Sequence, residues 1–193
     1  MRHATDLTAT DPGRFPGRHP PPDDGTIRAM TDPLIAAARH LFDDSAAEMR
    51  AAVEGASSDA LNWRPAGEET NSMAVLAVHS LHSMRWWLSV AVGRAEPERD
   101  RDAEFVASAD DAASLVAFCD SVAADCRALL SIEEPVDWSA PRTTTRERGD
   151  PDPLTAAWAL LHALEHLREH VAHLQLTRQL WDARQAGAPT GRE

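Results

Sequence analysis

Apolar side chains recur at intervals of three and four residues in four separate stretches of the chain. The stretches span residues 32–54, 71–93, 108–130 and 153–184. An α-helix turns once in about 3.6 residues, so this spacing places the apolar side chains of each stretch on one face. Each stretch is therefore predicted to be an amphipathic helix, and none shows the strict alternation typical of a half-buried strand.

Residues with short polar side chains mark the predicted starts of these helices. Thr31 or Asp32 precedes the first helix, and Asn71 or Ser72 precedes the second. Ser108 precedes the third and is followed by acidic residues. Such side chains accept hydrogen bonds from the free amides of the first helical turn, and acidic groups there favour the helix dipole. The sequence thus predicts these residues as helix caps.

The connections between the helices indicate how the helices are arranged. Residues 61–70 contain Asn, Pro and Gly, which favour a loop, and residues 133–153 are too many for a tight hairpin between neighbouring helices. The longer segment is predicted to cross over the bundle. We therefore expect an all-α fold, a four-helix bundle with long crossover connections, over residues 30–186, followed by a disordered tail at 187–193.

The first part of the chain differs from the rest in composition. Residues 1–29 are rich in Pro, Gly and charge and contain few apolar side chains that could be buried. A segment of this composition does not form a packed core. It is predicted to be a disordered extension, and Met30 is a candidate for the true start of the protein.

The balance of charge limits the classes of partner. The chain has 193 residues and a formal net charge of -12 at pH 7. Nucleic acids and anionic membranes attract basic surfaces, so neither is expected as a partner. No apolar run approaches the roughly 18 residues of a membrane span, and the N-terminus lacks the apolar core of a signal peptide. We therefore expect a cytoplasmic protein.

The two cysteines, Cys119 and Cys126, lie in the third predicted helix. Seven residues of helix separate them by about 10 Å along the axis. That distance exceeds the reach of a disulfide bond. They are predicted to be reduced thiols of the core, with a redox or metal-binding role as the alternative.

The fourth predicted helix carries four of the nine histidines of the chain, namely His162, His166, His170 and His173. Residues four apart lie one turn apart on the same face of a helix. His166 and His170 can therefore reach one point in space. Imidazole is the commonest protein ligand of divalent metals, and one helix can donate two imidazoles at this spacing. Such a pair needs a third ligand from another helix.

The second predicted helix offers His79 or, failing that, His82 as the third ligand. His79 falls in an apolar run, where an unpartnered ring would cost free energy on burial. Three neutral imidazoles leave a metal with an open position, which is typical of catalytic sites. The predicted site is thus His79, His166 and His170, with His162 and His173 as bystanders or pocket-lining residues.

Two other metal-site templates fit the sequence less well. Residues 166–170, "HLREH", match the H-x-x-E-H pattern of inverted zinc peptidases, in which Glu169 would be the general base. Those enzymes take a further ligand from a downstream glutamate, and only Glu193 follows. A di-iron bundle needs Glu-x-x-His pairs, which this sequence lacks.

Two long segments resemble a known family. "LNWRPAGEETNSMAVLAVHSLHSMRWWL" and "LLHALEHLREHVAHLQLTRQLW" are similar to the DinB/YfiT-like superfamily of metalloenzymes. The shared features are a loop with Trp and Pro, a Ser that opens the second helix, one His within that helix and a closing His-x-x-x-His. The resemblance covers residues 31–185. It implies a four-helix bundle and a divalent metal, zinc or nickel, on His79, His166 and His170.

The chain departs from the family after His170. Where the family has Gly-Gln, this sequence has Ala172 and His173. The alanine still allows close helix packing, but His173 can tune the pocket or compete as a ligand. Either Glu165 or Glu169 can also orient a ligand histidine through a hydrogen bond.

The resemblance also implies a class of activity. Characterised relatives include S-transferases and isomerases that use a low-molecular-weight thiol, bacillithiol or mycothiol. We therefore expect a metal-dependent S-transferase that acts on small electrophiles. The alternatives are a metal-dependent hydrolase at the same site, and a non-catalytic dimeric bundle that binds a ligand in a stress response. Because relatives commonly pair, a homodimer is expected.

Overall fold

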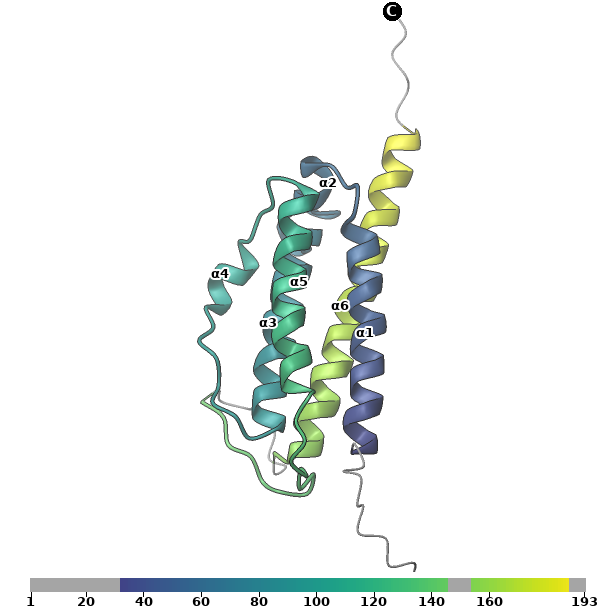
Figure 1. Cartoon of the computed structure of the whole chain (residues 1–193). Helices are drawn as coiled ribbons and strands as arrows, with labels where there is room; N and C mark the ends of the chain where they lie inside the picture. Colours follow the sequence, from purple (N-terminus) through teal and green to yellow (C-terminus); the bar gives the residue numbers. More distant parts are fainter. Residues whose placement is uncertain (1–31, 146–153, 188–193) are drawn as a thin grey trace, which may run out of the picture. The chain divides into compact units, whose positions relative to one another are not determined.

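The computed structural model describes residues 32–145 and 154–187, and within these residues it contains helices and no strands (Figure 1). The elements, in chain order, are α1 (Pro33–Val53), α2 (Ser58–Asn62), the 3-10 helix η1 (Gly67–Glu69), α3 (Met73–Ala91), α4 (Arg101–Phe105), α5 (Ala112–Leu129) and α6 (Ala156–Gly187). The predicted all-α class is confirmed. The predicted extension at 1–29 and residues 188–193 of the predicted tail lie outside the described residues.

The four long helices coincide with the four stretches of helical periodicity. α1, α3 and α5 each begin and end within a few residues of the predicted bounds. α6 continues to Gly187, beyond the predicted end at residue 184. The short elements α2, η1 and α4 were not predicted, because three to five residues are too few to show a period.

Side chains cap the long helices, with one correction to the prediction. Asp32 caps α1, and Ser72 caps α3, as expected. The cap of α5 is Asp111 rather than the predicted Ser108. The Asp111 carboxylate accepts a hydrogen bond of 2.7 Å from the amide of Ser114, which fixes the start of the helix three residues later than the serine would.

The long helices pack so that successive ones are not always neighbours. α1 packs against α5 and α6, and α3 packs against the same two helices. Figure 1 shows that α1 and α6 run in one direction while α3 and α5 run in the other. The connections from α1 to α3 and from α5 to α6 therefore join helices that lie diagonally across the bundle. For the connection from α5 to α6, this agrees with the crossover predicted for residues 133–153; the segment between α1 and α3 was predicted only as a loop.

α3 is the most buried of the helices, and nearly all its side chains are buried. Its position between α5 and α6 explains why its sequence is apolar on more than one face. Polar side chains on this helix, such as His79, are consequently inside the protein. None of the helices in the described residues has the length and apolar character that a membrane span needs.

The connection from α3 to α5 runs back along the length of the bundle, and α4 lies part-way along it (Figure 1). α4 packs against α3. This route brings residues 99–105 beside the middle of α3, although they are distant from it in sequence.

The two cysteines of the chain lie on α5 and are unbonded and buried. Burial disfavours the thiolate and raises the pKa of Cys119 to about 12 and that of Cys126 to about 12. Both are therefore protonated near neutral pH, as expected for core thiols.

Candidate metal centre

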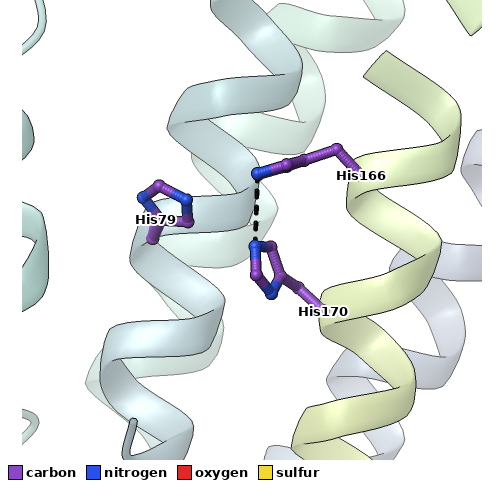
Figure 2. Close-up of side chains that lie close together, drawn as sticks. All are labelled: His79, His166 and His170. Carbon is purple, nitrogen blue, oxygen red and sulfur yellow. Dashed lines mark hydrogen bonds between the residues drawn. The ribbon is translucent and has the colours of Figure 1, made fainter. Parts of the chain in front are cut away.

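Three histidines from two helices converge inside the bundle (Figure 2). α3 supplies His79, and α6 supplies His166 and His170 from consecutive turns. One ring nitrogen from each residue lies within 4.8 Å of the other two. These are the three residues that the sequence pattern selected.

The distances between the rings suit a shared metal ion. The Nε2 atoms of His166 and His170 are 3.2 Å apart, and the ring of His79 lies 5.2 Å, centroid to centroid, from each of the other two. Two imidazole nitrogens on one tetrahedral zinc, each about 2.0–2.1 Å from the metal, are about 3.3 Å apart. The His166 and His170 nitrogens are thus already close to the spacing of two ligands.

The environment keeps the α6 histidines neutral. Burial, together with the neighbouring imidazoles, lowers the pKa of His166 to about 3 and that of His170 to about 4. Both rings are therefore uncharged at pH 7. A neutral imidazole has the free lone pair that a metal ligand requires, so the cluster is compatible with a divalent ion.

The three histidines differ in what their outer ring nitrogens contact. The Nδ1 of His79 lies 2.9 Å from Oε2 of Glu104. The Nδ1 atoms of His166 and His170 are buried and have no hydrogen-bond partner among the described residues. A metal bound at the Nε2 atoms would leave these two Nδ1 atoms as they are, so only His79 has a group in the described residues that orients its ring from the outer nitrogen.

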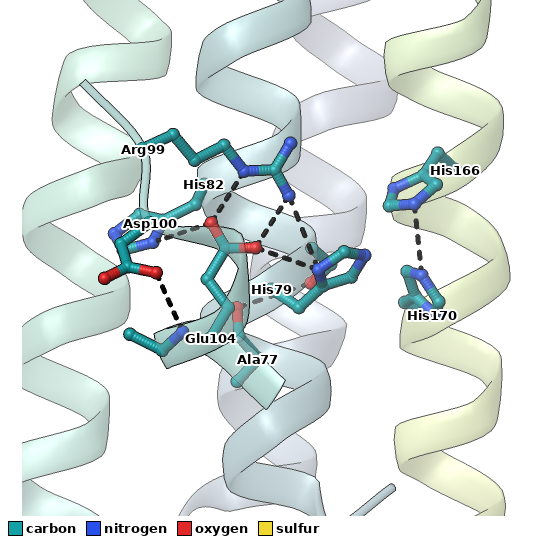
Figure 3. Close-up of polar contacts among 10 residues, drawn as sticks. Ala77, His79, His82, Arg99, Asp100, Glu104, His166 and His170 are labelled. Atoms are coloured by element: carbon teal, nitrogen blue, oxygen red, sulfur yellow. Dashed lines mark hydrogen bonds and ion pairs between the residues drawn. The ribbon is translucent and has the colours of Figure 1, made fainter. Parts of the chain in front are cut away.

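Glu104 is at the centre of a buried polar network (Figure 3). Its side chain is 2% exposed and accepts hydrogen bonds of 2.6 and 2.7 Å from Nε and Nη2 of Arg99. Burial alone would raise the pKa of Glu104, but hydrogen bonds with His79, His82 and Arg99 outweigh it and hold that pKa far below its usual range. The carboxylate is ionised at neutral pH.

The comparisons with known proteins identify the family of the chain and agree with the fold. Residues 41–174 match the DinB superfamily. The chain belongs to the DinB superfamily. No curated protein sequence matches it.

The DinB fold of this chain is also found among solved structures. The crystal structure of a conserved protein from Enterococcus faecalis superimposes with a TM-score of 0.60, over 77% of this chain and 96% of that one. The two sequences are 14% identical, so the likeness concerns the fold alone. The resemblance inferred from the histidine segments is thereby confirmed at the level of family and architecture.

Three further histidines of α3 and α6 in this DinB chain lie outside the three-residue cluster. His82, the alternative third ligand, has its Nδ1 3.4 Å from Oε1 of Glu104, and its ring contacts Phe118 at 5.3 Å between centroids. His162 stacks on Trp158 at 4.6 Å. His173 is exposed, with its ring 5.9 Å from that of His170.

The carboxylate that contacts a cluster histidine is not one of those considered from the sequence. Glu165 and Glu169 are both exposed on α6, and within the described parts of the chain neither forms a hydrogen bond with His166 or His170. On the α3 side, Glu104 forms the hydrogen bond with the cluster residue His79, and Arg99 in turn pairs with Glu104. The segment "RDRDAEF" that contains Glu104 has the composition of a solvated surface, so no sequence signal marked it.

Proposed function

We propose that this DinB superfamily member is a metal-dependent enzyme whose His79, His166 and His170 hold a divalent ion, zinc or nickel. The observation that carries the proposal is the convergence of three imidazole nitrogens within 4.8 Å, from two helices, at residues that the sequence pattern alone selects. Zinc and nickel both accept imidazole ligands.

The donor set fits catalysis better than a structural role. Structural zinc sites have four protein ligands, whereas catalytic sites have three and leave a position for water or substrate. Three neutral imidazoles also leave the charge of the ion uncompensated, which favours an anionic ligand. When bound, such an ion lowers the pKa of a coordinated thiol or water and supplies a nucleophile near pH 7.

The nucleophile is proposed to come from outside the protein. The only two thiols of the chain, Cys119 and Cys126, are buried on α5, and each has a pKa of about 12. Neither belongs to the histidine cluster. We therefore propose that the enzyme is an S-transferase that uses a low-molecular-weight thiol, mycothiol or bacillithiol, on a small electrophile.

A conjugation assay on the metal-loaded protein tests this function. The full chain, loaded with zinc or nickel, is mixed with each thiol in turn and with 1-chloro-2,4-dinitrobenzene as a model electrophile. We expect conjugation above the uncatalysed rate, lost in His166→Ala and retained in His40→Ala, a control on the exposed face of α1.

Each other result points to a different function. Consumption of ester substrates without any thiol would replace the transferase proposal by a metal-dependent hydrolase. A metal-loaded protein that turns over neither class, and that binds neither thiol nor anion, would contradict the enzymatic proposal and favour a non-catalytic bundle.

A further inference from the structure

We propose that Glu104, held by Arg99, is a positioning residue that fixes the tautomer and orientation of the His79 ring and so directs the Nε2 of His79 to the metal centre. The inference rests on the proposed function, because the role concerns His79 as a ligand. It deepens that function by adding a residue on α4 that touches no metal itself.

The hydrogen bonds around Glu104 determine which nitrogen of His79 carries the proton. Arg99 donates through Nε to Oε1 and through Nη2 to Oε2, at 2.6 and 2.7 Å, so Glu104 is a paired carboxylate that can only accept. The Nδ1 of His79, 2.9 Å from Oε2, must therefore be the donor. In the neutral ring, which is the form that binds a metal, that assignment leaves the Nε2 lone pair free.

A contact between Arg99 and His79 does not compete with the hydrogen bond from His79 to Glu104. Nη2 of Arg99 lies 3.4 Å from Nδ1 of His79. Both atoms are donors once Nδ1 carries its proton, so this contact is not a hydrogen bond. Glu104 is thus the group that sets the tautomer, and Arg99 acts on His79 through Glu104.

The same network orients the ring. Figure 3 shows Nδ1 of His79 turned toward Glu104 and the opposite ring nitrogen turned toward His166 and His170. Phe105, the residue after Glu104, lies 4.5 Å from the His79 ring between centroids. Two successive residues of α4 thus hold one imidazole by a hydrogen bond and by ring contact.

α4 itself depends on anchors elsewhere in the chain. A five-residue helix is too short to be stable alone, so tertiary contacts must hold it. Arg64 donates a 3.0 Å hydrogen bond to the carbonyl of Phe105. Asn62 exchanges two hydrogen bonds, of 2.8 and 3.0 Å, with the backbone of Ala109. The segment after α1 thereby fixes both the end of α4 and the chain that follows it.

A purely structural role is the rival explanation for the Arg99 and Glu104 pair. The two side chains are 7% and 2% exposed, and a buried ion pair is often no more stabilising than apolar side chains of similar volume. A gain in stability therefore does not by itself explain why two charged side chains are buried here. A structural role predicts a change in stability without a change in the His79 tautomer, which separates the two explanations.

Two double variants test the proposal without leaving a buried charge unpaired. Arg99→Met with Glu104→Leu, called the Leu variant below, removes the acceptor for Nδ1 of His79. Arg99→Met with Glu104→Gln, called the Gln variant, keeps an acceptor oxygen. The matched control is Arg168→Met with Glu48→Leu, which removes an ion pair of 2.7 Å between α6 and α1 away from the cluster. Circular dichroism shows whether each variant is folded.

The readouts are the tautomer of His79 in the metal-free full chain and the affinity for Co²⁺. Ring ¹⁵N spectra, assigned by comparison with His79→Ala, distinguish a protonated from an unprotonated Nδ1. We expect Nδ1–H in the wild type, in the control and in the Gln variant, and a loss of this preference in the Leu variant. Loss of such a partner weakens metal binding by about 10- to 100-fold, so we expect that decrease in the Leu variant and a smaller one in the Gln variant.

Each outcome decides one claim. A folded Leu variant that keeps Nδ1–H, or that binds Co²⁺ as tightly as the wild type, overturns the role of Glu104 and leaves the metal centre standing. If the wild type binds no Co²⁺, the proposed function fails, and the tautomer alone then decides what Glu104 does. If the Leu variant does not fold, the proposal is tested by the wild type and the control instead. An unprotonated Nδ1 of His79 in the wild type overturns it, and so does loss of the Nδ1 proton in the control.

Discussion

The two sides of the histidine cluster are constructed differently. On the α6 side, His166 and His170 come from consecutive turns of one helix, and their outer nitrogens have no partner among the described residues. On the α3 side, His79 is held by a carboxylate 25 residues away in sequence, which is itself paired with Arg99. The helix period suffices to align two ligands, whereas the third depends on contacts between distant segments.

This difference suggests a division of roles. α6 brings two nitrogens close together whatever the surroundings, since the backbone fixes their spacing. On the α3 side, a single histidine must be held in one tautomer and one ring orientation, and contacts from the α4 segment determine both. Changes on the α6 side should therefore remove ligands directly, and changes on the α4 side should act through His79.

The largest effect is expected from the α6 side. The double substitution His166→Ala with His170→Ala should abolish binding of Zn²⁺ and Co²⁺, because two of the three donors are lost. The helical signal in circular dichroism should be retained, since alanine favours the helix more than histidine does. Titration of both metals checks this, and a variant that still binds one equivalent would show that the cluster is not the site.

On the α4 side, the expected effect is on stability. Arg99→Met alone leaves the buried carboxylate of Glu104 without its cation, and breaking a buried pair in this way costs about 3–5 kcal/mol. The exposed pair on the other side of the bundle, tested by Arg168→Met, should cost less than about 1 kcal/mol. Urea unfolding of the metal-free proteins measures both, and equal costs would contradict the difference between the two regions.

A smaller effect is expected on the pH dependence of stability, which His166 and His170 on α6 should increase. Their pKa values in the folded protein, about 3 for His166 and about 4 for His170, lie below the ordinary histidine value of 6.5. The unfolded chain therefore binds protons first as the pH falls, and the stability contributed by the neutral rings is present above pH 6.5 and lost toward pH 4. The full shifts correspond to about 2 kcal/mol for each histidine between pH 7.5 and 5. Because both rings are partly exposed, we expect about half of the sum, so the metal-free wild type should lose about 2 kcal/mol more than the double alanine variant. Urea unfolding at the two pH values checks this, and parallel losses would contradict it.

The same contrast explains what the sequence could predict. The long helices α1, α3, α5 and α6 repeat an apolar pattern over several turns, and the pair His166 and His170 follows from that period. His79 was identifiable because a histidine in an apolar run needs a partner. These features are local, so they are visible without the fold.

The parts that sequence reasoning missed depend on contacts across the chain. α4 has five residues and no period, and its charged sequence has the pattern of a solvated segment. Only the path of the connection between α3 and α5 brings Glu104 and Arg99 to His79. The same reasoning gave Glu165 and Glu169 as candidates because they are neighbours on α6, and the structure places both in solvent.

Metal content is the measurement that tests the central claim most directly. The full chain, purified without chelator, is analysed by plasma mass spectrometry beside His79→Ala and beside His173→Ala, an exposed histidine next to the site. We predict about one equivalent of zinc or nickel in the wild type and in His173→Ala, and a large loss in His79→Ala. A wild-type protein that contains no metal and binds neither added zinc nor added nickel would contradict the claim that the three histidines form a metal centre.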